Sequence, residues 1–209
     1  MLKHVENNVH EGDRTFEGLV GGHRIDLIEV CAPWDSPLCQ AVRELGGTAL
    51  ALGIHNGYDL TTQEGYRKAI STIRELRPRY LHVSPPCFLW SSFQNCTKRN
   101  EQQRQEFEHM RCSSKRLITR CARLLEIQLK ELDGQGGHSE TFHGGGEHPL
   151  RAQSWRATNM GHMARMCGGR FTVHGCCHGM IDPQSRKLIR KPWGWFSTLV
   201  GVRDALESK

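Results

Sequence analysis

The sequence predicts an α/β fold in which a mostly parallel sheet is flanked by helices. Two observations support this fold class. Short, nearly continuous apolar runs at 25–30 and 80–84 are typical of strands that are buried on both faces of a parallel sheet. Segments at 38–45 and 66–76, which follow such runs, repeat their apolar residues at helical spacing. Strands and helices that alternate in this way build parallel β-α-β units.

In chain order, residues 1–23 are polar, and we expect a flexible leader there. Residues 24–209 are expected to form a single domain. Its predicted strands are 24–31, 48–52, 80–84, 139–143, 171–174 and 195–199. Its predicted helices are 37–45, 63–77, 98–132, 153–167 and 202–207, and the third of these could break near Ser113-Ser114.

Proline, glycine and capping residues set the boundaries of the first elements. Pro33 ends the first strand, and Asp35 or Ser36 can cap a helix that has Pro37 at its first position. Glycines at 46 and 47 stop that helix. The second helix begins in a capping box at 61–64 and ends before Pro78.

Composition limits the location and the partners of the chain. Its 209 residues carry a formal net charge of +6, which fits a nucleic-acid partner without requiring one. No apolar run approaches the roughly 20 residues that span a bilayer, and the amino terminus at 1–4 lacks the apolar core of a signal peptide. We therefore expect an intracellular protein of the nucleus or cytoplasm, not secreted and without a membrane partner. The odd count of 9 cysteines favours reduced thiols over a disulfide framework.

Cys87 is the first candidate for chemistry. Pro85 and Pro86 cannot continue a central strand, so Cys87 falls just past the carboxyl end of the strand at 80–84. Ligands bind at that end of open α/β sheets. A thiolate that is stabilised there can act as a nucleophile, whereas the alternative is a structural cysteine after a turn. Glu147 follows the predicted strand at 139–143 and would share this edge, where it could act as an acid; the alternative is a solvated loop residue.

Three other segments are candidates for binding. The loop at 31–36 follows the first strand without a G-x-G-x-x-G motif, and Glu29 and Asp59 could still bond a ribose or an adenine. The Cys176-Cys177-His178 cluster could hold zinc, although it lacks the usual two-residue spacer. The stretch 186–195 alternates basic residues with indoles, which suits phosphates and bases or a solvated turn.

The order of these motifs resembles the DNA cytosine-C5 methyltransferases and their smaller relatives in phages and retroelement-type polyproteins. Ser84-Pro85-Pro86-Cys87 is similar to the Pro-Cys nucleophile motif of that family. Glu147-His148-Pro149 is similar to its Glu-Asn motif, and 25–30 is similar to its first cofactor motif. The segment 175–193 resembles a cysteine-plus-Lys-Pro segment of the shortened relatives. The resemblance covers about residues 25–200.

The resemblance implies a Rossmann-like S-adenosylmethionine methyltransferase fold that methylates cytosine C5 in DNA. Cys87 would attack C6 of a flipped base, Glu147 would engage N3, and Arg151 would support the anionic intermediate. The residues implied for S-adenosylmethionine are Glu29, Cys31, Trp34, Asp35, Asp59 and Pro85. Those implied for nucleic acid are Ser91, Ser92, Arg186, Arg190 and Lys191.

Two alternatives stay open. The cofactor loop without glycine, together with the basic segment, would also suit an inactive methyltransferase-like module that binds nucleic acid or protein. The cysteine and histidine cluster at 174–178 would suit a zinc-stabilised structural protein.

Overall fold

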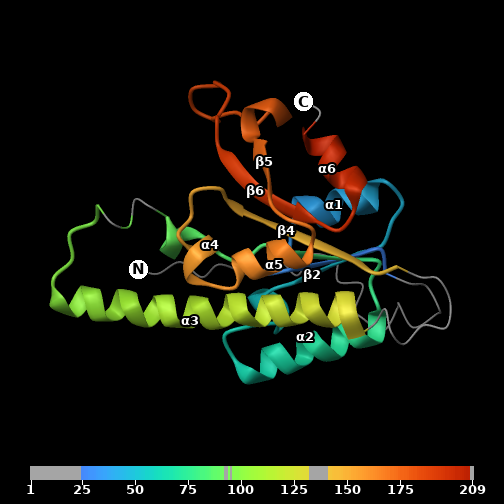
Figure 1. Cartoon of the computed structure of the whole chain (residues 1–209), viewed down its shortest axis with the longest axis horizontal. Coiled ribbons are helices and arrows are strands. Elements are labelled where there is room, and N and C mark those ends of the chain that lie inside the picture. The colour runs from blue at the N-terminus through green and yellow to red at the C-terminus, as the bar shows by residue number, and fades with distance from the viewer. Residues whose placement is uncertain (1–24, 92–93, 95, 132–140, 208–209) are drawn as a thin grey trace, which may run out of the picture.

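The computed structural model of the chain describes residues 25–91, 94, 96–131 and 141–207, and it contains one six-stranded sheet of order β2-β1-β3-β4-β6-β5 (Figure 1). The predicted leader lies outside the described residues. The strands are β1 (Leu27–Val30), β2 (Ala49–Leu52), β3 (Tyr80–Val83), β4 (His143–Pro149), β5 (Phe171–His174) and β6 (Pro192–Ser197). The helices are α1 (Pro37–Glu44), α2 (Gln63–Leu76), α3 (Glu101–Glu126), α4 (Ser154–Ala157), α5 (Met160–Met166) and α6 (Val200–Glu207).

The sheet is mostly parallel, as predicted. Neighbours β2, β1, β3 and β4 all pair in parallel. The exception is β6, which runs antiparallel between β4 and β5. The predicted α/β class with a mostly parallel sheet flanked by helices is therefore confirmed.

Helices cover both faces of this sheet. On one face, Ile28 and Leu81 pack with helix residues such as Ile73, Leu125 and Met163, from α2, α3 and α5. On the other face, Leu27 and Ala51 pack with residues of α1. Figure 1 shows α2 and α3 together on one side of the sheet, with α1 and α6 on the other. Because side chains alternate along a strand, β1 directs Glu29 toward the α1 face.

The prediction for the strand that carries Glu147 was wrong. We expected a strand at 139–143 with Glu147 after it, whereas β4 spans His143–Pro149 and includes Glu147. Close packing explains why a run of three glycines forms a strand here. A Cβ at Gly144 would collide with Leu125, and one at Gly146 would collide with the Val83 carbonyl. Glycine is therefore required by the neighbours of β4 and does not mark a loop.

Three other boundaries also differ. Helix α3 runs without a break through Ser114, whose hydroxyl accepts a hydrogen bond from Trp90 Nε1 at 2.8 Å, and it is followed by a π-helical turn at Ile127–Glu131. The predicted helix at 153–167 is two helices, α4 and α5, separated at Thr158, whose backbone is extended. The last strand begins at Pro192 rather than at 195. Its first residues pair with β5 on one side and with β4 on the other, and this pairing holds them in the sheet.

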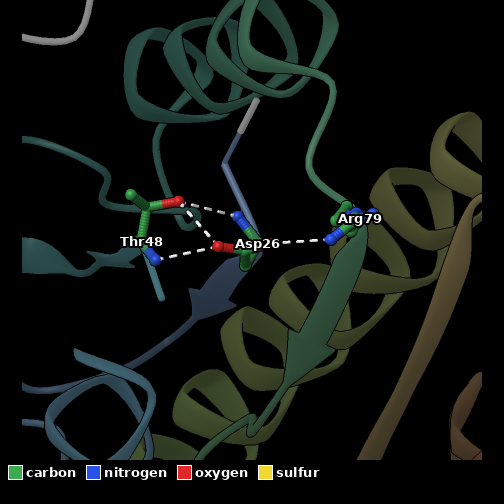
Figure 2. Close-up of polar contacts among 3 residues, drawn as sticks. All are labelled: Asp26, Thr48 and Arg79. Carbon is green, nitrogen blue, oxygen red and sulfur yellow. Dashed lines mark hydrogen bonds and ion pairs between the residues drawn. The ribbon is translucent and has the colours of Figure 1, made fainter. Parts of the chain in front are cut away.

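The amino-terminal ends of three strands are fastened together by Asp26, as Figure 2 shows. Its Oδ2 accepts from the Thr48 backbone nitrogen at 2.9 Å and from the Thr48 hydroxyl at 3.1 Å. Its Oδ1 lies 3.4 Å from Arg79 Nη1, just before β3. These hydrogen bonds hold the pKa of Asp26 below its usual value. This edge of the sheet is structural, and the opposite edge carries the candidate site.

No helix within the described ranges is long and apolar enough to cross a membrane.

Candidate functional site

The candidate site lies at the carboxyl edge of the sheet, where the strand order reverses. β1 sits between β2 and β3, so the chain leaves β1 toward one neighbour and returns to its other side. Crevices outside such a reversal point are the usual ligand sites of open α/β sheets. The loop after β3 crosses this point and contains buried Pro85 and half-buried Cys87, followed by a 3₁₀ helix at Phe88–Trp90.

Glu147 reaches the same edge from the next strand. β4 pairs with β3 so that Gly146 lies opposite Val83, which brings Glu147 level with Ser84. Glu147 shares the α1 face of the sheet with Glu29, which accepts a 3.4 Å hydrogen bond from the Ser84 hydroxyl. The structure therefore brings Cys87 and Glu147 to one edge, although Glu147 belongs to a strand and not to a loop.

Burial and neighbouring charges determine the pKa of Glu147. Its Oε2 is buried and has no hydrogen-bond partner among the described residues. Burial raises the pKa of Glu147 to about 7, Lys191 opposes this rise, and the negative charge of Glu29 adds to it. Near neutral pH this group is therefore divided between acid and carboxylate, as a general acid or base requires.

The same groups act on Cys87. Burial raises the pKa of the Cys87 thiol, and the charge of Glu147 adds to this rise. Lys191 lowers it. Proton loss from Cys87 is therefore easier when Glu147 is protonated, since the carboxyl group then adds no negative charge beside the thiol.

Among the described residues, the cation that acts on both Cys87 and Glu147 is Lys191. The Arg151 side chain is exposed and makes no hydrogen bond or ion pair with another described residue. Lys191 comes just before β6, and its Nζ lies 4.0 Å from the ring centroid of Trp193. It was expected to contact nucleic acid. Its action on Cys87 and Glu147 arises from the pairing of β6 beside β4, which local sequence does not reveal.

In three of the residues implied for the cofactor, the polar side-chain atoms already contact other residues of the protein. Glu29 is buried and accepts from the Ser36 hydroxyl. Cys31, with a left-handed φ of 64°, places its Sγ 3.7 Å from Cys121 Sγ. Asp59 Oδ1 accepts from the Thr61 backbone nitrogen at 2.8 Å and hydroxyl at 2.7 Å, next to the start of α2. These contacts give the three residues a part in building the loops.

Of the other residues implied for the cofactor, Trp34 and Asp35 lie at the protein surface. Trp34 is 73% exposed, and Asp35 is exposed beside it. Pro85 is buried and supports the Cys87 loop. An indole and a carboxylate at this edge could contact an aromatic ring and hydroxyl groups.

The residues implied for nucleic acid are spread apart in the structure. Ser91 is half-buried next to the 3₁₀ helix, and Ser92 lies outside the described residues. Arg186 and Arg190 are exposed in the hairpin-like segment between β5 and β6, where Ile181 and Leu188 form a β-bridge. Only Lys191 of this group acts on Cys87 and Glu147.

Two buried histidines lie on the strands of the site; sequence reasoning missed His82 and named His148 only as part of the motif that contains Glu147. His82 on β3 is buried with its ring centroid 5.5 Å from that of Trp195, and burial lowers its pKa to about 4. His148 is buried on the other face of the sheet beside Trp155, and burial lowers its pKa to about 4 as well. The sequence did offer one signal for His82. It lies within a short strand that is predicted to be buried on both faces, so its side chain would be buried as well.

The zinc alternative finds no supporting cluster within the described ranges, where no three His, Cys, Asp or Glu side chains are arranged to hold a metal ion.

Comparisons with known proteins identify no relative. No protein-family model matches the chain, and no curated protein matches it significantly.

Proposed function

We propose that this protein is an S-adenosylmethionine-dependent methyltransferase that acts on C5 of cytosine in DNA, with a Rossmann-like fold and Cys87 as nucleophile. One observation carries the proposal: Cys87 follows β3, Glu147 lies on the neighbouring strand β4 close enough for its charge to act on the thiol, and the pKa of Glu147 is about 7. A thiol beside a protonatable carboxyl is the pair needed to activate a pyrimidine ring.

In this reaction Cys87 Sγ forms a bond to C6 of the ring as the thiolate. Protonated Glu147 hydrogen-bonds N3 and donates its proton there, so that the electron pair displaced by attack is not left as a full negative charge on the ring. The C5 carbon becomes nucleophilic as a result. Later the C5 proton passes to solvent water, the Cys87 thiolate leaves C6, and the Glu147 carboxylate takes back the N3 proton, which restores the neutral aromatic ring. Lys191 favours the thiolate at the first and last steps.

The residues implied for the cofactor fit it in part. Exposed Trp34 and Asp35 would hold S-adenosylmethionine, with the indole against the adenine and the carboxylate toward hydroxyl groups. Glu29, Cys31 and Asp59 are assigned to loop structure because their polar atoms already bond within the chain. When bound, the cofactor supplies an electrophilic methyl group.

Two features support a nucleic-acid base as the acceptor. Phe88, directly after the nucleophile, is 58% exposed, and a flipped base could stack on its ring. Lys191 is exposed over Trp193 at the same edge, so a phosphate or a base could contact both.

The inactive binding module remains as a second candidate, and a specific observation favours it. Burial raises the pKa of Cys87, which disfavours the thiolate in the free protein. In a module of this kind the site residues would serve only the fold. Nucleic-acid binding would then be the same with and without Cys87.

Isothermal titration calorimetry with S-adenosylmethionine tests the proposal. We expect binding below millimolar ligand, a loss of at least fivefold in affinity for Trp34→Ala, and unchanged affinity for Cys87→Ser. The Cys87 variant is the matched control, because it alters the nucleophile and leaves the crevice intact. No heat of binding at millimolar ligand would refute the enzyme and leave the binding module.

A further inference from the structure

A basic hollow lies away from the candidate site, on the outer surface of α3 between α2 and α5. It has a volume of about 720 Å³. We call it the α3 groove and define it by its charged lining, which is Lys115, Arg116, Arg120, Arg123, Glu126 and His162. Four permanent positive charges therefore face one carboxylate.

Most of this positive charge is not neutralised. Lys115 and Arg116 are exposed, and neither contacts a carboxylate among the described residues. Glu126 accepts from Arg123 at 3.2 Å and lies 3.1 Å from His162 Nε2. The single acid of the groove, Glu126, thus pairs with Arg123 and His162 at the end of the groove farthest from Lys115. The charged lining near Lys115 consists of cations.

Arg120 is held in place by neutral groups. Its Nη1 donates to the Leu60 carbonyl at 2.8 Å and to the Thr62 carbonyl at 2.6 Å, and its Nη2 donates to Gln63 Oε1 at 2.9 Å. Its Cζ lies 4.9 Å from the ring centroid of Tyr66. None of these partners cancels the charge, so the guanidinium is a fixed cation at the wall of the groove.

The cations form a row along the helix. From Lys115 to Arg123 the helix rises about 12 Å at about 1.5 Å per residue. This length matches three to four phosphates of a nucleic-acid strand at roughly 3.4 Å each. Arginine and lysine are the residues that bind phosphate most often, and arginine does so through two donors.

We propose that the α3 groove binds the phosphodiester backbone of a nucleic acid. An anionic membrane fits less well, because membrane-surface helices need a broad apolar face. The exposed side chains that α3 contributes to the groove include no large apolar group; they are Cys112, Lys115, Arg116, Thr119 and Arg123. An acidic protein fits less well for a similar reason, since protein interfaces carry few charges at their core.

The groove is separate from the proposed reaction. Ser114 contacts Trp90 behind the Cys87 loop, while the next two residues face the groove on the outside of α3. The inference therefore does not rest on catalysis by Cys87, and Cys87→Ser is expected to leave binding in the groove unchanged.

Fluorescence anisotropy with a fluorescein-labelled 20-nucleotide DNA, single-stranded and duplex, tests the groove across a range of salt. The test variant is Lys115→Gln/Arg116→Gln, whose side chains are exposed, so the fold is expected to persist. The matched control is Arg43→Gln/Lys98→Gln, which removes the same charge from exposed positions outside both the groove and the basic segment at 186–195. Thermal unfolding of both variants checks the fold.

We expect the groove variant to bind about tenfold more weakly than the wild type and the control to stay within twofold. The slope of log affinity against log salt should become shallower by about 1.5, since each lost phosphate contact removes roughly 0.7 to 0.9. Equal losses in both variants, or no binding by the wild type, would overturn the proposal. So would binding of a polyglutamate peptide or of phosphatidylserine vesicles that is as tight as that of DNA and as sensitive to the groove variant.

Discussion

The hydroxyl of Ser36 donates a hydrogen bond to Glu29 Oε2, and it accepts one from the backbone nitrogen of Cys39 at 3.1 Å. One side chain thus caps α1 and also satisfies a buried carboxylate at the end of β1. Through this contact the first helix fixes the loop that carries Trp34 and Asp35. The position of this loop therefore depends on Ser36, whose hydroxyl is engaged within the protein.

Ser36→Ala is expected to lower the free energy of unfolding by about 2 kcal/mol. Loss of the helix cap costs about 1 kcal/mol, and a buried carboxylate without its hydroxyl partner costs a similar amount. Urea unfolding at pH 7 measures the change, with Ser185→Ala as an exposed serine control. A loss no larger than that of the control would contradict this account of Ser36.

Glu147 is expected to make the stability of the protein fall as pH rises. Its pKa is about 7 in the folded state against an ordinary value of 4.5, so the folded state binds more protons between these values. The stabilisation is full below pH 4.5 and is lost as pH rises through 7. Glu147→Gln stays neutral, so we expect it to be more stable than the wild type at pH 8.5, by about 3 kcal/mol.

Urea unfolding of both proteins at pH 5 and pH 8.5 tests this prediction. The difference between them should nearly vanish at pH 5 and appear at pH 8.5. A wild type whose stability advantage over Glu147→Gln grows with pH would show that the carboxylate, and not the acid, is the favoured buried form.

His82 is expected to make the stability of the protein fall as pH falls, which is the opposite of the effect of Glu147. Burial lowers its pKa from 6.5 to about 4, so the unfolded state binds more protons in this window and stability is lost as pH falls through it. Between pH 6.5 and 4.5, His82→Leu should lose about 2 kcal/mol less of its free energy of unfolding than the wild type loses. His109→Leu, at an exposed position of α3, is the control. If the stability of His82→Leu falls with acid as steeply as that of the wild type does, this prediction is contradicted.

Sequence patterns sufficed for the elements that local rules determine. Prolines, caps and apolar runs placed β1, α1, β2, α2 and β3 within a few residues. β4 was misplaced because the need for glycine at Gly144 and Gly146 comes from Leu125 and Val83, which are distant in sequence.

The candidate site was predictable only in part, for the same reason. Cys87 and Glu147 could be proposed from strand ends and from a family resemblance. Lys191 could not be assigned to them, because its position depends on β6 pairing beside β4. The internal roles of Glu29 and Cys31 depend on Ser36 and Cys121, and local sequence shows neither contact.

The central claim is that Cys87 attacks C6 of cytosine. It is tested most directly by incubating the protein and S-adenosylmethionine with a DNA duplex that contains 5-fluorocytosine. Fluorine replaces the C5 proton whose loss releases the enzyme, so a reacting cysteine stays bonded to the base. We expect a covalent protein–DNA adduct in denaturing gels, with the modified peptide containing Cys87, and no adduct with Cys87→Ser. An adduct that persists in Cys87→Ser, or its absence from wild-type protein that binds both ligands, would contradict the account.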